Sequence, residues 1–204
     1  MDLKQRMPKT PKGLKTFQKL VDSAKILFHE SSYHVTTVEA IAARAEVATG
    51  TFYLYFDSKL SIFRYLVYKF YHDIRKTIAS ATKEASSRYE IERLGLKAFI
   101  NYVIKNPFAY TIIWQSLVVD KALFKNYYSS FAERYRIQIE EAIKQNQIKK
   151  EVDPLTIAYA LMGVSNFIGL QVIAFNDREL SDTEIDSITN KAMLLIDKGI
   201  INYK

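Results

Sequence analysis

Four hydroxyl side chains and a glycine lie close together in the first third of the chain. They are Thr49, Gly50, Thr51, Tyr53 and Tyr55. Hydroxyl groups and a backbone without a side chain are suited to contacts with phosphate oxygens and with base edges in a DNA groove. The chemistry that this segment predicts is therefore binding of nucleic acid, and helices are needed to position it.

Two short helices that meet at a tight turn are predicted around these residues. Thr36 is a good N-cap, and Glu39 three places later completes a capping box at the start of the first helix. In the second helix Phe52 and Phe56 stand at i and i+4, so we expect them to point inward and to leave the hydroxyls outside. An ordinary helical hairpin with solvated threonines fits the same pattern, and the pattern alone does not decide between the two.

A longer series of residues extends this pattern on both sides of the turn. A helix over residues 14–30 ends in a Leu-Phe pair. It is followed by an aromatic step, a threonine cap, an Ile-Ala pair, a Gly-x-x-Tyr-x-x-Phe run and a Ser-Lys pair. They are Leu27-Phe28, Ser32-Tyr33, Thr36-Thr37, Ile41-Ala42, Gly50 to Phe56 and Ser58-Lys59. In order and spacing the series resembles the DNA-binding domain of the tetracycline-repressor (TetR) family of bacterial transcription regulators.

Three residues depart from the usual pattern of that family. Ser32 and Glu46 each stand where the family usually has glycine, and Ser32 is strained if it adopts a left-handed backbone. Glu46 also brings a negative charge near the expected phosphate path. Ala48 replaces a usual serine before the second helix, so the cap either passes to Thr49 or is lost at about 1 kcal/mol.

The resemblance implies a role for each residue of the segment. Thr49, Thr51 and Tyr55 would face the DNA groove. Thr37, Tyr53 and Lys59 would contact phosphates and fix the register, and Gly50 would leave room for a phosphate. The family also implies a homodimer on a pseudo-palindromic DNA operator and a ligand pocket in the carboxyl-terminal domain.

Only 6 glycines and 4 prolines favour long helices, and helical spacing along the chain predicts an all-α protein of about nine helices. The 204 residues are enough for a small domain joined to a larger one, and the resemblance implies a DNA-binding domain with a basic arm over residues 1–60 and a larger helical domain over 61–204. The chain has no cysteine and begins without an apolar secretory signal, which favours the reducing cytoplasm. No cofactor or metal is predicted.

Positive charge is concentrated toward the amino terminus. Residues 1–80 hold 13 basic and 7 acidic side chains, whereas the other 124 hold 16 and 15. The basic residues in or before the first helix are Lys4, Arg6, Lys9, Lys12, Lys15 and Lys19. A basic arm can follow the phosphate backbone of DNA, but a solvated tail without partners fits the same residues.

Aromatic residues recur along the helices of the larger domain. As walls of an effector pocket we expect Tyr102, Phe108, Tyr110, Trp114, Phe131, Tyr135 and Phe167. Such walls favour a small apolar or aromatic effector. Plain core packing is the alternative, and we expect fewer than half of the seven to touch a ligand.

Residues 154–176 contain no charged side chain, which is long enough to raise the question of a membrane span. Polar residues near its centre and the lack of basic flanks favour a buried helix and no membrane. Small and apolar residues on this helix and on the last one predict a dimer interface: Ala160, Gly163, Phe167, Gly169, Ile188, Ala192, Leu195 and Ile196. Completion of the core of one subunit is the alternative.

The sequence as a whole favours a homodimeric, ligand-responsive transcriptional repressor. An enzyme has little support, because the three histidines show no ligand or nucleophile spacing and no glycine-rich phosphate loop is present. A ligand-responsive helical interaction protein with weak or no specific DNA binding is the main alternative, and a nonspecific DNA-coating protein is a third.

Overall fold

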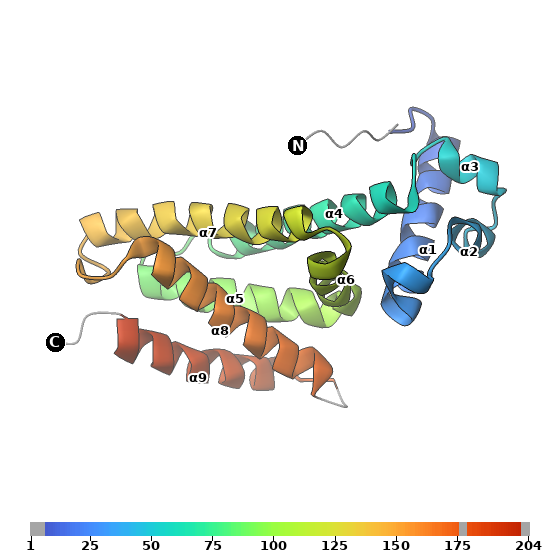
Figure 1. Ribbon diagram of the computed structural model, residues 1–204. Helices are drawn as coiled ribbons and strands as arrows, with labels where there is room; N and C mark the ends of the chain where they lie inside the picture. Colours follow the sequence, from blue (N-terminus) through green and yellow to red (C-terminus); the bar gives the residue numbers. More distant parts are fainter. Residues whose placement is uncertain (1–6, 176–178, 201–204) are drawn as a thin grey trace. The chain divides into compact units, whose positions relative to one another are not determined.

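The computed structural model describes residues 7–175 and 179–200, and these residues form helices joined by short turns (Figure 1). Nine helices lie within the described residues: α1 (Pro11–Val35), α2 (Val38–Arg44), α3 (Thr49–Tyr53), α4 (Lys59–Ala81), α5 (Arg88–Lys105), α6 (Pro107–Val119), α7 (Lys121–Lys144), α8 (Pro154–Ala174) and α9 (Asp182–Ile200). The prediction of an all-α fold with about nine helices is confirmed.

The chain divides into two compact units. The first contains residues 1–71 and 108–125, and the second contains residues 72–107 and 126–204. This division differs from the predicted boundary after residue 60. The reason is that the first part of α4 and nearly all of α6 pack with α1.

Aromatic side chains form the core of the first unit. Thr10 caps α1 by accepting a hydrogen bond of 3.1 Å from the backbone N–H of Gly13. Further along α1, Phe17 stacks on Phe56 with ring centres 5.1 Å apart. The helices around the turn are thus held against α1 by buried rings.

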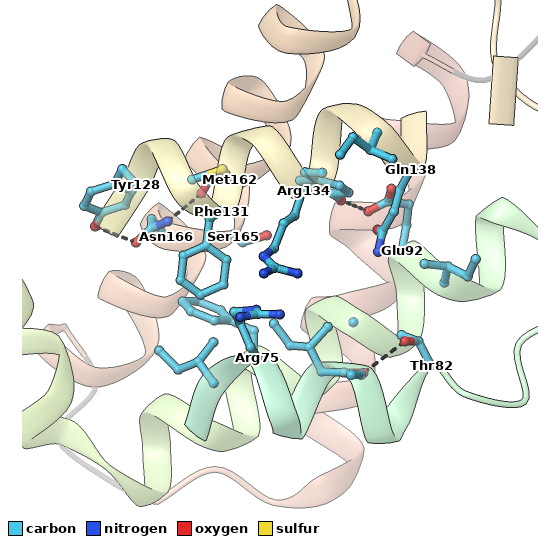
Figure 2. Close-up of a pocket in the computed structure, with 18 of the residues that line it drawn as sticks. Arg75, Thr82, Glu92, Tyr128, Phe131, Arg134, Gln138, Met162, Ser165 and Asn166 are labelled. Atoms are coloured by element: carbon cyan, nitrogen blue, oxygen red, sulfur yellow. Dashed lines mark hydrogen bonds between the residues drawn. The ribbon is translucent and has the colours of Figure 1, made fainter. Parts of the chain in front are cut away.

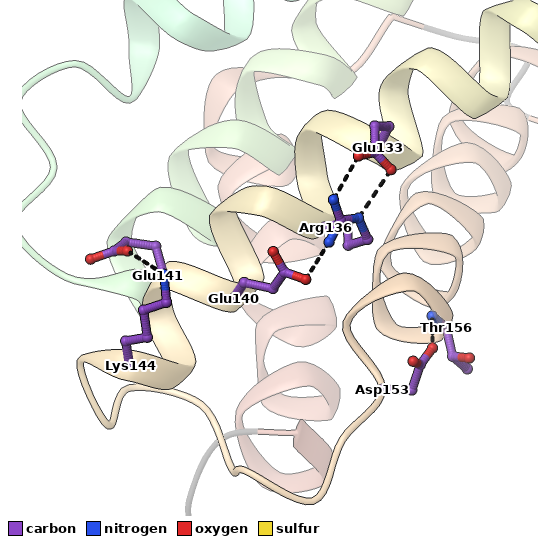
Figure 3. Close-up of polar contacts among 7 residues, drawn as sticks. All are labelled: Glu133, Arg136, Glu140, Glu141, Lys144, Asp153 and Thr156. Carbon is purple, nitrogen blue, oxygen red and sulfur yellow. Dashed lines mark hydrogen bonds and ion pairs between the residues drawn. The ribbon is translucent and has the colours of Figure 1, made fainter.

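In the second unit α5 packs against both α8 and α9. Asp153 caps α8 with a hydrogen bond of 2.7 Å from the backbone N–H of Thr156, and this bond lowers the pKa of the Asp153 carboxyl (Figure 3). On α7, Arg136 forms ion pairs with Glu133 and Glu140 (Figure 3). These contacts lie on the surface, where charged pairs contribute little to stability.

Helix α8 is only partly the buried helix that we expect from the sequence. Among the described residues it is the helix that is long and apolar enough to cross a membrane, judged by length and composition alone. Of the residues in its most apolar stretch, 22% are buried. Leu155, Tyr159, Phe167 and Phe175, spaced by multiples of four residues, are exposed. The expectation is incorrect for this face, because α8 is apolar on two sides and the second unit covers one of them.

Candidate functional site

The first helix of the predicted pair begins one residue later than expected. Thr37, not Thr36, is the N-cap of α2, and its hydroxyl accepts a hydrogen bond of 3.1 Å from the backbone N–H of Ala40. Thr36 ends α1 instead, and its hydroxyl donates to the carbonyl oxygens of Leu27 and Ser32. The capping box of Thr36 with Glu39 is therefore wrong, because α1 continues to Val35 and uses Thr36 for its own end.

The turn between α2 and α3 depends on a left-handed residue. Glu46 has φ 56°, its N–H donates to the carbonyl of Ala43, and the N–H of Val47 donates to the carbonyl of Ala42, each over 3.0 Å. These two bonds define a Schellman motif, whose left-handed position is usually glycine. This left-handed position explains why the family pattern usually has glycine here. Glu46 adopts the same backbone conformation although it carries a side chain.

Helix α3 starts without a side-chain cap. Ala48 occupies the N-cap position, and no side chain bonds to the free N–H groups there, so Thr49 has not taken over the role. Phe52 and Phe56 are completely buried, as predicted. Of the two alternatives for the N-cap of α3, transfer to Thr49 or loss, the structure shows the loss.

The outer side of α3 is open to solvent. Gly50 is exposed, and a Cβ atom built on it would meet no atom within 4 Å. Tyr53 is 48% exposed and the neighbouring Leu54 is 60% exposed. Thr49 and Thr51 are half-buried on the same helix. This short helix combines a buried aromatic with exposed polar and backbone groups, which is the arrangement that a DNA groove requires.

Tyr55 differs from the expectation that it faces a DNA groove. It follows α3, it is half-buried, and its ring lies edge-on to Phe17 of α1, with centres 5.9 Å apart. The aromatic contact directs Tyr55 toward α1 and away from the outer side of α3.

Lys59 is bound within the protein. Its ammonium group donates to the carbonyl oxygens of Tyr33 and Thr36, each at 2.7 Å, and lies 3.4 Å from that of His34. Partial burial lowers the pKa of the Lys59 ammonium. A direct phosphate contact does not agree with this geometry, because the three donors of the ammonium group face the end of α1.

Other basic residues of the first unit lie just before α1 or in its first half. Lys19 forms an ion pair of 2.6 Å with Glu46, and this contact lowers the pKa of the Glu46 carboxyl. Within the described residues Lys9, Lys12 and Lys15 are exposed and make no ion pair. Lys4 and Arg6, the rest of the predicted basic arm, lie outside the described residues.

Sequence reasoning missed Gln115 of α6, which repairs the kinked end of α1. Ser32 breaks the helix there with φ 65° and ψ 165°. The amide of Gln115 donates to the carbonyl of Phe28 over 2.7 Å and accepts from the N–H of Tyr33 over 2.8 Å. One side chain thus satisfies two backbone groups at the kink, and it fastens α6 to α1.

The second unit contains a cavity of about 450 Å³ among α4, α5, α7 and α8 (Figure 2). Of the seven predicted wall residues, Phe131 and Tyr135 line it. Tyr102 lies elsewhere in the second unit, Phe167 is exposed, and the other three belong to α6 of the first unit: Phe108, Tyr110 and Trp114. The prediction of these five as walls of this cavity is not supported, because periodicity does not reveal which helices enclose a space.

Several polar groups of the lining are already satisfied. Thr82 and Ser165 each donate through their hydroxyl to the carbonyl four residues earlier, and the Asn166 amide does the same. The Tyr128 hydroxyl donates to the amide oxygen of Asn166 over 3.3 Å. These groups therefore add little polarity to a lining that is rich in Ile and aromatic side chains.

A buried ionic cluster borders this cavity. Glu92 of α5 lines it, forms an ion pair with Arg88 one turn earlier, and accepts a hydrogen bond from the Tyr135 hydroxyl. Burial, together with the Glu92 charge, raises the pKa of the Tyr135 hydroxyl well above its usual value. The negative charge of Glu92 is thus matched before any ligand binds.

The predicted dimer residues fall into two groups. Gly169, Ala192 and Ile196 are buried inside the second unit, and Ile188 packs against its core. For these four the interface assignment does not agree with the structure, because they complete the subunit core. Phe167 and Leu195 are 67% and 66% exposed, Ala160 is exposed and Gly163 is half-buried.

These features define a helix-turn-helix DNA-binding protein with a separate cavity-bearing helical unit. Residues 20–66 match the family described as bacterial regulatory proteins, tetR family. The chain belongs to the TetR family of bacterial transcriptional regulators, and it functions as a DNA-binding regulator.

Relatives with known names agree with this family. The chain is 28% identical over 138 residues to a Bacillus subtilis protein named "Probable HTH-type transcriptional regulator YttP", which covers 65% of this chain and 67% of that protein. It is 36% identical over 69 residues to the HTH-type transcriptional repressor DhaR of Mycobacterium sp. strain GP1. This match covers 34% of this chain and 35% of that protein.

Solved structures share the fold over most of the chain. The fatty acid degradation regulator FadR from Bacillus halodurans aligns with a TM-score of 0.78 at 18% identity, covering 93% of this chain and 96% of that one. The regulator FadR from Bacillus subtilis, in complex with stearoyl-CoA, aligns with a TM-score of 0.76 at 19% identity, covering 90% and 98%. At this identity the alignments show the fold.

Proposed function

We propose that this regulator is a homodimeric, ligand-responsive repressor that acts in the cytoplasm on a pseudo-palindromic operator. The observation that carries the proposal is the outer side of α3, where Gly50 and Tyr53 are exposed above buried Phe52. We infer that the protein acts by binding, with no catalytic step.

We propose that α3 enters the major groove. Thr49 and Thr51 read base edges, while Thr37, Tyr53 and the open backbone at Gly50 contact phosphates. The exposed lysines at the start of α1 add contacts that depend on charge and not on sequence. Lys59 positions the end of α1 and acts on DNA through it.

The exposed apolar faces of α8 and α9 support a homodimer. Tyr159 and Phe167 on α8, with Leu194 and Leu195 on α9, would be covered by the same residues of a second copy. The smaller side chains at Ala160 and Gly163 would let the helices approach closely. Two recognition helices then reach half-sites roughly 34 Å apart, about one turn of DNA.

The cavity of the second unit is the proposed effector site, and its volume lies within the range typical of small-molecule sites. The complex of Bacillus subtilis FadR with stearoyl-CoA supports an effector with a hydrocarbon chain. Helix α4 carries both Lys59 and cavity residues such as Ile74, so an effector that displaces α4 changes the DNA-binding unit. Coupling of about 1–3 kcal/mol is typical of such regulators.

The DNA-binding part is tested by selecting sites from a random duplex pool at near-physiological salt. We expect a palindrome with half-sites about one turn apart. Thr49→Ala should change the preferred bases, whereas Lys12→Ala should weaken binding to every sequence and lower the salt dependence. Salt-sensitive binding without enrichment of any sequence would instead identify a nonspecific DNA-coating protein. No binding to DNA would favour a ligand-responsive helical interaction protein.

The effector site is tested at Gly95, which lines the cavity from α5. A Cβ atom built there lies 3.7 Å from Ile78 and 3.8 Å from Thr82, so alanine fits by ordinary contact. Gly95→Leu should fill the cavity and abolish both ligand binding and the response of DNA binding, while Gly95→Ala is the matched control. Unchanged ligand binding in Gly95→Leu would rule out this cavity as the effector site.

A further inference from the structure

Three lysines form a basic face on the first half of α1. Lys12, Lys15 and Lys19 are spaced by three and four residues, so they lie on one side of the helix. All three side chains are exposed. Such a face is suited to the phosphates of a DNA strand, and each lysine that neutralises a phosphate adds affinity that does not depend on sequence.

Lys19 differs from the other two because it already has an acidic partner. Its ammonium nitrogen lies 2.6 Å from a carboxylate oxygen of Glu46, in the turn between α2 and α3. Lys12 and Lys15 make no ion pair within the part of the chain that the structure describes. The positive charge of the basic face is therefore cancelled where it meets this turn.

The backbone of the turn holds Glu46 in place. Its φ of 56° is left-handed, and its N–H donates to the carbonyl oxygen of Ala43 over 3.0 Å. Glycine, which is usual at this position in the family, adopts the same conformation without a charge. Glu46 also stands two residues before Ala48, the N-cap of α3. The turn therefore does not need the carboxylate, which lies close in the chain to the helix that we propose enters the major groove.

Both members of the pair are accessible to a phosphate. The side chain of Glu46 is 79% exposed and that of Lys19 is 44% exposed, so the pair is solvated and contributes little to stability. Asp22, one turn further along α1, is bound to Lys25 at 2.8 Å and to Gln18 at 3.0 Å. Glu46 is therefore the carboxylate that determines whether Lys19 is free to bind DNA.

We propose that Glu46 withholds Lys19 from the DNA phosphates and thereby lowers the affinity for all sequences, while base recognition by α3 is unaffected. An ammonium group whose charge is already matched by a carboxylate neutralises no phosphate and releases no counterion from the DNA. If Lys19 bound a phosphate, the carboxylate would remain beside the DNA backbone and be repelled by it. The inference rests on the proposed function, in which the exposed lysines of α1 contact phosphates.

The experiment is a double-mutant cycle in the full chain with Glu46→Gln and Lys19→Gln, each of which removes one charge. Binding to a mixed-sequence duplex of about 30 base pairs, long enough for two half-sites, is measured at several salt concentrations. Glu46→Gln should bind about threefold or more tightly, and its slope of log affinity against log salt should steepen by about 0.9. Lys19→Gln and the double variant should both keep the wild-type slope, because Lys19 binds a phosphate only when Glu46 is absent.

Two controls accompany the cycle. Glu84→Gln removes the same charge from an exposed side chain of the second unit, so it should leave the affinity and the slope unchanged if the location of the charge matters. Site selection from a random duplex pool with Glu46→Gln should return the bases that the wild type prefers. Different preferred bases would overturn the proposal, because Glu46 would then read base edges itself.

The failures of the two proposals are distinguishable. Lys12→Ala tests the phosphate contacts of α1 directly, and a lowered slope in this variant with no change in Glu46→Gln would overturn only the role of Glu46. A gain that persists in the double variant, or a lowered slope in Lys19→Gln alone, would show that Lys19 is not the group that Glu46 withholds. Unchanged slopes in both Lys12→Ala and Glu46→Gln would overturn both proposals.

Discussion

The ammonium group of Lys59 lies 2.7 Å from the carbonyl oxygen of Tyr33 and 4.4 Å from the centre of the same residue's ring. A cation that binds the last carbonyls of a helix satisfies acceptors that the helix itself leaves free. The aromatic face adds a cation–π contact. Lys59 therefore fixes where α1 ends, immediately before the helix that presents Thr37.

Lys59→Ala should destabilise the protein by about 1–2 kcal/mol, because three carbonyl oxygens lose their donor. DNA binding should weaken for all sequences, with an unchanged slope of log affinity against log salt. Chemical denaturation and salt titrations measure the two effects. Lys12→Ala is the control and should leave stability unchanged within about 0.5 kcal/mol while lowering the slope. A flatter slope in Lys59→Ala at unchanged stability would restore the phosphate role.

Ser32→Gly should stabilise the protein by about 1 kcal/mol. Ser32 has φ 65° and ψ 165°, a region that glycine occupies without the penalty of a Cβ atom. The neighbouring Ser31 lies within helical backbone, so Ser31→Gly should have the opposite sign and cost up to about 1 kcal/mol. Thermal unfolding of the two variants measures the difference, and destabilisation by Ser32→Gly would show that its side chain outweighs the strain.

Gln115→Ala should destabilise the first unit by about 1–3 kcal/mol, because the carbonyl of Phe28 and the N–H of Tyr33 lose their partner. It should also weaken operator binding, since Phe17 of α1 stacks on Phe56, and Phe56 in turn contacts Phe52 of α3. Hydrogen exchange at Tyr33 measures the local effect. The control is Gln145→Ala, at an exposed residue directly after α7, which should leave exchange at Tyr33 unchanged. The same exchange rate in Gln115→Ala would contradict the role of Gln115.

Local patterns predict part of the fold well. Phe52 and Phe56 at i and i+4 are both buried as expected, because their spacing alone selects one helix face. The adjacent threonines show the limit of such reasoning. Both can cap a helix, and the choice of Thr37 depends on Gln115 and Lys59, distant in sequence, which let α1 continue past its kink.

The cavity shows a second limit of reasoning from sequence. Aromatic spacing selects Trp114 and Phe131 equally, yet α6 packs with the first unit and only Phe131 lines the cavity. Arg134, which also lines the cavity, carries no signal in the sequence, since a charged residue on an amphipathic helix is usually a solvated one. Similarly, Phe167 on α8 and Ile196 on α9 each belong to an apolar stripe of their helix. The sequence does not reveal that Phe167 is exposed and Ile196 is buried in the core.

The hydrogen bond from Tyr135 to Glu92 predicts a loss of stability in strong alkali. Burial holds the folded-state pKa of Tyr135 well above the usual 10.0, so the unfolded chain releases this proton first as the pH rises. The contribution of Tyr135 is therefore complete below pH 10 and is lost above it. Urea denaturation from pH 8 to pH 11.5 measures the slope.

Tyr135→Phe should cost about 1–3 kcal/mol at neutral pH, because a buried oxygen of Glu92 loses its donor. Above pH 10 its stability should fall less steeply than that of the wild type, since phenylalanine has no proton to release. Tyr89→Phe, at an exposed tyrosine next to Arg88, should keep the wild-type slope because Tyr135 is still present. Parallel alkaline slopes in the wild type and Tyr135→Phe would show that Tyr135 ionises as readily in the folded protein as in the unfolded chain.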